Sequence, residues 1–238
     1  MKINIVIHNF KEKYEKLIIA LLYFFLIAGG LWHLLGVLQT VMRVLAAPLI
    51  VGLTILIYMD FHLSNSVSNQ KLANFDFHVK LPLFAIFIII CSFFVELYGV
   101  KSGLIFGHYE YGTILKPQLW TVPIAIGFAW LGMILSSYAV VYQLLLRKKR
   151  MSPVIITLLM SVLMVIFDAF MEPAAIELNY WIWTTNHAPF QNYVAWFIIS
   201  FIFIMIGNYT GFFKLKPTKL MFHTYFAQLI YFFMILFK

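Results

Sequence analysis

Three carboxyl groups lie close together in the segment FDAFMEPAAIELNYWIW, which covers residues 167–183. They belong to Asp168, Glu172 and Glu177, and no Lys or Arg between positions 151 and 213 is available to neutralise them. Asp168 and Glu172 are four residues apart, so a helix that persists through this segment places both on one face. Mutual repulsion and partial burial both favour the neutral, protonated form of such a pair. A protonated carboxyl in an apolar, aromatic setting is a proton donor.

Two more acidic residues occur earlier in the chain in a similar setting. Glu96 stands near the end of the apolar run 81–99, and Glu110 lies in the Tyr- and Gly-rich segment that follows. An acidic side chain at membrane depth costs about 2.5–3.5 kcal/mol on insertion scales, so it usually marks a function or a specific partner. We therefore name Asp168, Glu172, Glu96 and Glu110 as the candidate catalytic residues.

Simpler explanations exist for each of these features. Glu172 and Glu177 can be interfacial side chains in contact with water. Asp168 can be a protonated partner in a hydrogen bond between two helices. The aromatic residues nearby, such as Tyr109 and Trp181, are also typical of the belt that lies at a membrane–water interface. The residues alone leave these alternatives open.

Long apolar runs must position the candidate residues. Of the 238 residues, 63% are hydrophobic and only 11% are charged, which is too little polar surface for a soluble domain of this size. About 20 apolar residues span a hydrocarbon core, and the strand-like alternation of a membrane barrel is absent. The sequence therefore predicts one all-α domain over residues 1–238. This domain is a polytopic membrane bundle of about seven helices, near 17–35, 44–59, 81–99, 120–146, 153–171, 193–212 and 220–237.

Basic residues predict the orientation of this bundle. With seven spans, the side opposite the N-terminus holds only Arg43, Lys101, Lys116 and Lys238 of the 17 Lys and Arg residues. By the positive-inside rule the N-terminus is cytoplasmic. We therefore expect a multi-pass protein of the cell membrane, surrounded by the lipid bilayer, with its active site toward the non-cytoplasmic side. The net charge of +8 then reflects orientation, and binding of nucleic acid is not expected because no soluble module is present.

The connections between the spans differ in composition. Residues 60–80 have a Ser- and Asn-rich middle, which predicts a cytoplasmic loop. Residues 100–119 and 172–192 fall on the outer side and are rich in Tyr, Trp, Gly and Glu. No cleavage signal of small residues follows the first span convincingly, so we expect an uncleaved anchor rather than a signal peptide.

Other site chemistries receive little support from the sequence. Membrane di-iron sites need closely spaced histidines, whereas the seven histidines here are far apart. A zinc site built from His108, Glu110 and His187 is an alternative that their spacing does not demand. A retinal Schiff base needs a lysine within the bundle, but the last span has Lys219 and Lys238 only at its two ends.

Two segments together resemble a known family. Residues 95–130, VELYGVKSGLIFGHYEYGTILKPQLWTVPIAIGFAW, are similar to a block in which an acid precedes a Gly-aromatic-x-Tyr-Gly loop and a Val-Pro helix that bears a Trp. Residues 167–200 resemble a second block with Asp, an acid followed by Pro, Trp-x-Trp, Pro-x-x-Asn and a further Trp. These blocks resemble the integral-membrane carotenoid 1,2-hydratases, which include gamma-carotene 1'-hydratase and bisanhydrobacterioruberin hydratase. That family usually has Asp-Pro where this chain has Glu172-Pro173, a change that keeps the carboxylate.

The resemblance implies the addition of water to the terminal C1=C2 double bond of an acyclic carotene end. A protonated carboxyl would protonate C2 and leave a tertiary cation at C1; Asp168 is the first choice, with Glu96 or Glu172 as alternatives. A second carboxylate, Glu172 or Glu110, would orient and deprotonate the incoming water. The expected partners are an acyclic or monocyclic carotene and water, and no metal or organic cofactor is required.

The same resemblance implies a set of substrate-binding residues. Aromatic faces stabilise a nearby cation by about 0.5–2 kcal/mol each without trapping it covalently. The expected binding residues are Tyr109, Tyr111, Trp130, Trp181, Trp183, Asn192 and Trp196.

Three alternative functions remain at this stage. A carotenoid cyclase of the lycopene type starts from the same protonation but excludes water, so that a neighbouring double bond attacks the cation. A proton-coupled transporter would use Asp168 and Glu96 as carriers, although transport favours acids spread across the depth of the membrane. A membrane scaffold without catalysis would leave the unpaired acids without an explanation.

Overall fold

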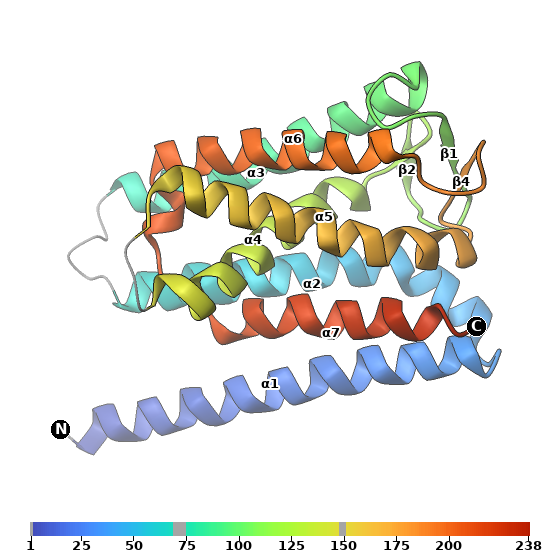
Figure 1. Ribbon diagram of the computed structural model, residues 1–238. Helices are drawn as coiled ribbons and strands as arrows, with labels where there is room; N and C mark the ends of the chain where they lie inside the picture. The colour runs from blue at the N-terminus through green and yellow to red at the C-terminus, as the bar shows by residue number, and fades with distance from the viewer. Residues whose placement is uncertain (1, 69–74, 148–150) are drawn as a thin grey trace.

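The apolar runs of the sequence form long helices. The computed structural model describes residues 2–68, 75–147 and 151–238, with side chains for 14–66, 79–147 and 151–238. Seven α-helices occur in these ranges and lie side by side in one bundle (Figure 1): α1 (Lys2–Leu34), α2 (Gln39–Ser68), α3 (Phe75–Ser102), α4 (Ala125–Val141), α5 (Pro153–Glu177), α6 (Phe190–Thr210) and α7 (Lys219–Ile235). A π-helical turn, Tyr142–Leu146, continues α4, and a 3-10 turn, Phe212–Lys214, follows α6.

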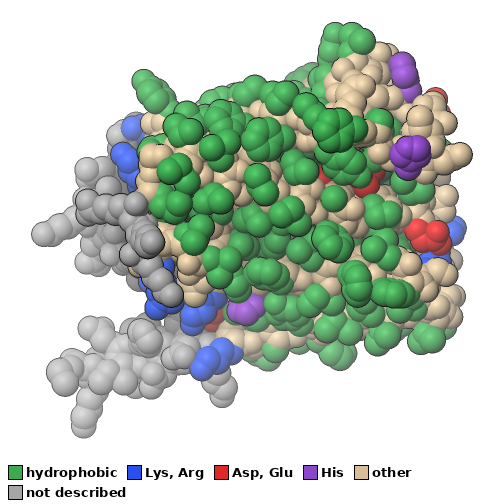
Figure 2. Space-filling view, viewed as in Figure 1, with side chains coloured by type: hydrophobic (Ala, Val, Ile, Leu, Met, Phe, Trp, Pro, Cys, Tyr) green, Lys and Arg blue, Asp and Glu red, His purple; other side chains and the backbone are tan. Residues whose placement is uncertain are grey.

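The bundle has the dimensions and surface of a membrane protein. Of the described helices, α1 to α6 are long and apolar enough to cross a membrane. The seventh, α7, has 17 residues and packs against α1, α4 and α5. Figure 2 shows hydrophobic side chains over most of the visible flank. The chain is therefore an all-α, multi-pass membrane protein, as the sequence predicts.

Helix α4 forms the centre of the bundle. It contacts α2, α3, α5 and α7, and nearly all of its residues are buried. A helix that is apolar on every side suits this position. Gly127 lets α4 approach the backbone of α3, and Gly132 faces the side chain of Thr54 in α2. The Thr54 hydroxyl donates a hydrogen bond to the carbonyl of Phe128 at 3.0 Å, which fixes α2 against α4.

The predicted cytoplasmic loop over residues 60–80 is wrong in its extent. Helix α2 continues to Ser68 and α3 begins at Phe75. Side chains at the polar end of α2 donate hydrogen bonds to backbone carbonyls. The amide of Asn65 donates to the carbonyl of Phe61 at 2.9 Å and to that of Lys216 at 3.0 Å, which ties this end of α2 to the segment before α7.

The two predicted outer loops contain short strands. These are β1 (Tyr109–Tyr111) and β2 (Gln118–Leu119) in the first loop and β4 (Trp181–Trp183) in the second, while β3 (Val122–Pro123) lies just beyond the first loop. The β2–β3 hairpin occupies the start of the predicted span 120–146, so α4 begins only at Ala125. Helix α5 continues through Pro173 to Glu177, beyond its predicted end. Figure 1 shows that β1, β2 and β4 gather at the same end of the bundle as the C-terminus.

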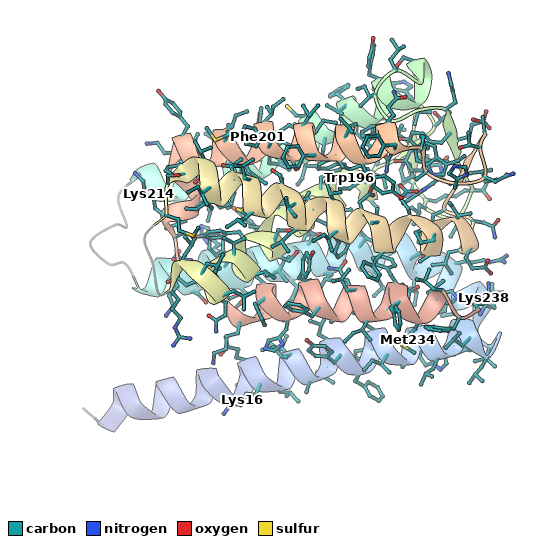
Figure 3. The ribbon with its side chains drawn as sticks, in the orientation of Figure 1. Lys16, Trp196, Phe201, Lys214, Met234 and Lys238 are labelled. Carbon is teal, nitrogen blue, oxygen red and sulfur yellow. The ribbon has the colours of Figure 1, made fainter. Side chains whose placement is uncertain are left out.

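Basic side chains gather at the opposite end. Lys16 and Lys214 lie toward the N-terminal end in Figure 3, whereas Lys238 lies at the end that carries the strands. The remaining basic residues that the sequence assigns to the cytoplasm include several outside the described side chains: Lys2, Lys11, Lys13, Lys71, Lys148, Lys149 and Arg150. The side of the membrane that each end faces stays a prediction.

The close packing of α4 gives a first testable prediction. Gly127→Ala should lower the thermal unfolding midpoint of the purified protein in detergent, because the added Cβ would lie 2.5 Å from the carbonyl oxygen of Ile89. Overpacking of this kind costs about 1–3 kcal/mol. The matched control is Gly52→Ala in α2, where a Cβ meets nothing within 4 Å and the helix gains about 0.5–1 kcal/mol. Equal midpoints for the two variants would contradict the tight approach of α4 to α3.

Candidate active site

A two-stranded antiparallel ribbon lies at one end of the bundle. Strands β1 and β4 pair so that Tyr109 faces Trp183 and Tyr111 faces Trp181. Successive side chains of a strand point to opposite faces. These four aromatic side chains therefore share the face that is turned toward the helices, while Glu110 lies on the other face and is exposed. The rings of Tyr109 and Trp183 contact each other with a centroid separation of 4.7 Å.

Glu96 is a buried carboxyl near the end of α3 that accepts three hydrogen bonds. The hydroxyls of Tyr109 and Tyr111 donate to its Oε2 at 2.5 and 3.0 Å. The indole N–H of Trp130, from α4, donates to its Oε1 at 3.0 Å. All three donors are neutral, so they satisfy the lone pairs of a carboxylate without bringing a positive charge into the site.

Tyr109 and Tyr111 remain protonated hydrogen-bond donors at physiological pH. Burial raises the pKa of the Tyr109 and Tyr111 phenols well above the usual value, and the neighbouring charge of Glu96 raises the pKa of both further. Because both phenols keep their protons, they hold Glu96 in place and do not compete with it for negative charge.

Glu172 is held by the other strand of the same ribbon, β4. The indole N–H groups of Trp181 and Trp183 both donate to its Oε2, at 2.9 and 2.8 Å. The two tryptophans are two residues apart on β4, so the alternation of the strand brings both indoles to one face. The Trp-x-Trp spacing of the sequence therefore allows two indole N–H groups to donate hydrogen bonds to one carboxyl.

Asp168 lies one helical turn before Glu172 and is fully buried. Its Oδ2 accepts a hydrogen bond from the side-chain amide of Asn192, in α6, at 2.7 Å. Its Oδ1 is buried and has no hydrogen-bond partner among the described residues. A buried oxygen that lacks a donor is costly when it carries charge, so the geometry suits a carboxyl that holds a proton.

A cavity of about 70 Å³ lies between the ribbon and the helices. Since roughly 10–15 Å³ of such space accommodates one water, a few waters fit, whereas a whole carotene does not. Trp130 and Trp196 stack in its wall, with ring centroids 4.0 Å apart and an interplanar angle of 11°. Trp196 lies in the half of α6 nearest the strands (Figure 3). Of the described residues that line the cavity, none is Lys, Arg or His.

The cavity brings together most of the residues that the sequence singles out. Glu96 and Glu172 line it, and so do all the predicted binding residues, which are Tyr109, Tyr111, Trp130, Trp181, Trp183, Asn192 and Trp196. Asp168 does not line the cavity itself. It is joined to the cavity through Asn192, by the hydrogen bond, and through Glu172, its neighbour on α5.

Two other acids stand apart from this cluster. Glu110 is exposed on the outer face of β1, and Glu177 forms an ion pair with Lys238 at 3.2 Å in partial contact with solvent. His108 and His187 are also exposed. Across the described parts of the chain, no group of three or more His, Cys, Asp or Glu side chains could hold a metal ion. The arrangement therefore gives no support to the zinc site that the sequence left as an alternative.

Nine further residues line the cavity, and the sequence did not indicate them: Ile50, Phe106, Leu115, Ile126, Ala129, Met133, Met171, Tyr180 and Phe232. Tyr180 precedes β4, Ile50 belongs to α2, and Phe232 belongs to α7. Tyr180 adjoins the Trp-x-Trp motif, which is a signal that could have revealed it. Ile50 and Phe232 lie within apolar runs, where nothing distinguishes them from residues that face lipid.

Comparisons with known proteins show which family the chain belongs to. Bisanhydrobacterioruberin hydratase from Haloarcula japonica is 25% identical to this chain over 122 residues, which are 50% of this chain and 41% of that protein. The chain therefore matches less than half the length of this relative. No solved structure matches the chain. Residues 67–238, more than half of the sequence, match the model of the family described as carotenoid biosynthesis protein. The chain belongs to this carotenoid biosynthesis family.

Proposed function

We propose that this protein is a carotenoid hydratase, a hydro-lyase that adds water across the terminal C1=C2 double bond of an acyclic carotene end. One observation carries the proposal: three buried carboxyls, without a cation among the described residues of the cavity, adjoin an aromatic wall in a member of a carotenoid biosynthesis family. The name of the Haloarcula relative supports hydration as the reaction. The substrate is an acyclic or monocyclic carotene, and the active site faces the non-cytoplasmic side.

The proton comes from the pair formed by Asp168 and Glu172. Two carboxyls one turn apart in an apolar site do not both ionise readily, so they share a proton. Asp168, with its unpartnered oxygen, holds this proton at rest. The proton passes from Asp168 to Glu172, the member of the pair that lines the cavity, and Glu172 transfers it to C2 of the bound alkene. Protonation at C2 leaves a tertiary cation at C1.

Glu96 and the aromatic wall stabilise that cation. Glu96 accepts three hydrogen bonds, more than either of the other two carboxyls, so it is the carboxyl best suited to remain ionised. Its fixed negative charge acts where positive charge develops, without needing to reorient. The stacked indoles of Trp130 and Trp196 add the attraction of their faces, and they do not bond covalently to the cation.

Water completes the reaction and returns the proton. After the first step, Asp168 and Glu172 both lack a proton, and their mutual repulsion makes the pair a strong base. A water in the cavity forms the new C–O bond at C1 and gives one proton to Glu172. The catalyst is thus restored, and one water has been added to the substrate. No metal or organic cofactor is needed in this sequence of steps.

The activity is tested by product analysis. When the protein is expressed in cells that accumulate lycopene, we expect a more polar product whose mass has increased by one water, measured by chromatography and mass spectrometry. An isomer of unchanged mass would instead indicate a cyclase, which uses the same cation without water. Unchanged lycopene in cells that contain the protein in their membranes would contradict both reactions.

The acid pair is tested by isosteric substitutions. Glu172→Gln and Asp168→Asn remove the shared proton and its carrier while keeping side-chain volume, so each should reduce hydrated product by about 10²–10⁴-fold. Glu110→Gln is the matched control, because this residue is exposed on the other face of the ribbon. Product and membrane abundance are measured together. Full activity in Glu172→Gln would remove this residue from the mechanism.

The donors to Glu96 are tested by deleting one hydroxyl. Tyr109→Phe keeps the ring but removes the 2.5 Å hydrogen bond, so we expect about tenfold slower turnover from the loss of roughly 1.4 kcal/mol at the transition state. Tyr98→Phe, at an exposed position of α3, is the control. Initial rates in membranes, compared at equal protein, provide the measurement. A reduced protein level with an unchanged rate per molecule would show that Tyr109 acts on stability alone.

A further inference from the structure

A large apolar groove lies between α1, α2 and α7, outside the cavity. Its volume is about 530 Å³, and only Tyr180, Gln228 and Tyr231 contribute polar groups to its described lining. Helix α1 lies at the edge of the bundle beside α7 (Figure 1), with 17% of its most apolar window buried. Phe25 and Leu49, two residues of the lining, are 60% and 57% exposed. The groove therefore opens toward lipid.

The lining follows continuous stripes along two helices. On α1 it runs from Ile18 to Gly29. On α2 it runs from Met42 to Leu56, where Met42, Ala46, Leu49, Gly52, Leu53 and Leu56 follow helical spacing and Pro48 and Ile50 flank them. Such spacing keeps the side chains on one face of each helix. The α2 stripe is about 21 Å long at 1.5 Å per residue, which is roughly two thirds of a hydrocarbon core. A straight, stiff and apolar molecule fits a groove of this length and composition.

The groove and the cavity share part of their walls. Ile50, Tyr180 and Phe232 line both spaces. Tyr180 is also hydrogen-bonded to Tyr231 of α7, and burial raises the pKa of the Tyr180 phenol to about 12. Tyr180 thus stays neutral beside the groove. These three residues, which we call the neck, separate the groove from the cavity, so the end of an apolar chain in the groove would have to pass between them to reach Glu172.

We propose that this groove binds the polyene chain of the carotene while the neck admits its terminus to the cavity. The inference rests on the proposed function and adds the place where the body of the substrate lies. The cavity of about 70 Å³ holds only the reacting end, so the rest of the molecule requires an adjoining apolar site. An anionic lipid headgroup is disfavoured at the inner end of the groove, because the neck leads to carboxyl groups.

A single position allows the groove to be filled without disturbing the fold. Gly52 lines the groove, and a Cβ built on it meets nothing within 4 Å. Gly52→Trp therefore projects an indole into the groove. Gly52→Ala controls for the change in the backbone of α2. Ile86→Trp places the same indole on a lipid-exposed face of α3, which does not line the groove.

The variants are compared by the lycopene they retain and by the product they form. The full-length protein is purified from lycopene-accumulating cells, and bound lycopene is measured by visible absorbance per molecule of protein. We expect Gly52→Trp to retain about tenfold less lycopene than the unaltered chain, equivalent to roughly 1.4 kcal/mol of binding. Hydrated product should fall with it. Ile86→Trp should match the unaltered chain in both measurements, and Gly52→Ala should lose far less of either than Gly52→Trp.

Two outcomes would overturn the groove as the polyene site. One is unchanged retention and product in Gly52→Trp. The other is a groove occupied by phospholipid acyl chains, with lycopene in the unaltered protein no higher than in an unrelated membrane protein from the same cells. If Gly52→Trp loses lycopene but no variant, nor the unaltered chain, forms hydrated product, the groove stands and the proposed hydration fails.

Discussion

Neutral hydrogen-bond donors, and not cations, hold the three buried carboxyls in place. The rest of the site depends on the neutrality of these donors. Burial of a carboxylate costs several kcal/mol after relaxation, and each hydrogen bond to a charged group returns about 1.5–3 kcal/mol. An Arg or Lys would return more, but it would keep the nearby carboxyl ionised. Phenol, indole and amide donors lower the cost of burial and leave a proton free to move. The donors are Tyr109, Tyr111, Trp130, Trp181, Trp183 and Asn192.

The fold can supply these donors because two distant connections pair as strands. Strand β1 follows α3 and strand β4 follows α5, so their pairing places donors from one ribbon on carboxyls of two different helices. Tyr109 and Tyr111 reach back to Glu96, and Trp181 and Trp183 reach back to Glu172. Helices α4 and α6 add one donor each. Helix α4 thus contributes a donor to Glu96 as well as forming the centre of the bundle.

The sequence predicted the bundle and its acidic end well, because both depend on local patterns. Apolar runs locate the helices, and the four-residue spacing of Asp168 and Glu172 places them on one face once α5 continues past Pro173. The pairing of β1 with β4 depends on contacts between remote segments, and three-residue strands carry no periodic signal of their own. For the same reason the sequence grouped Glu110 with the other acids, whereas the register of the ribbon puts it on the opposite face. Which carboxyl of the α5 pair lines the cavity depends on how the helix packs, which spacing alone does not specify.

Under the proposed function, two reactants must meet at the end of the bundle that carries the carboxyls. A carotene is soluble only among apolar side chains, whereas water has to be stabilised by polar groups. Within the described structure, the groove between α1, α2 and α7 offers the first environment and the carboxyl-lined cavity the second, with Ile50, Tyr180 and Phe232 between them. A carrier of protons across the membrane would need acids along its depth, but Glu96, Asp168 and Glu172 all lie in the halves of α3 and α5 nearest the strands. Their clustering suits a reaction at one double bond, at the end of an apolar chain and next to a polar cavity that can hold water.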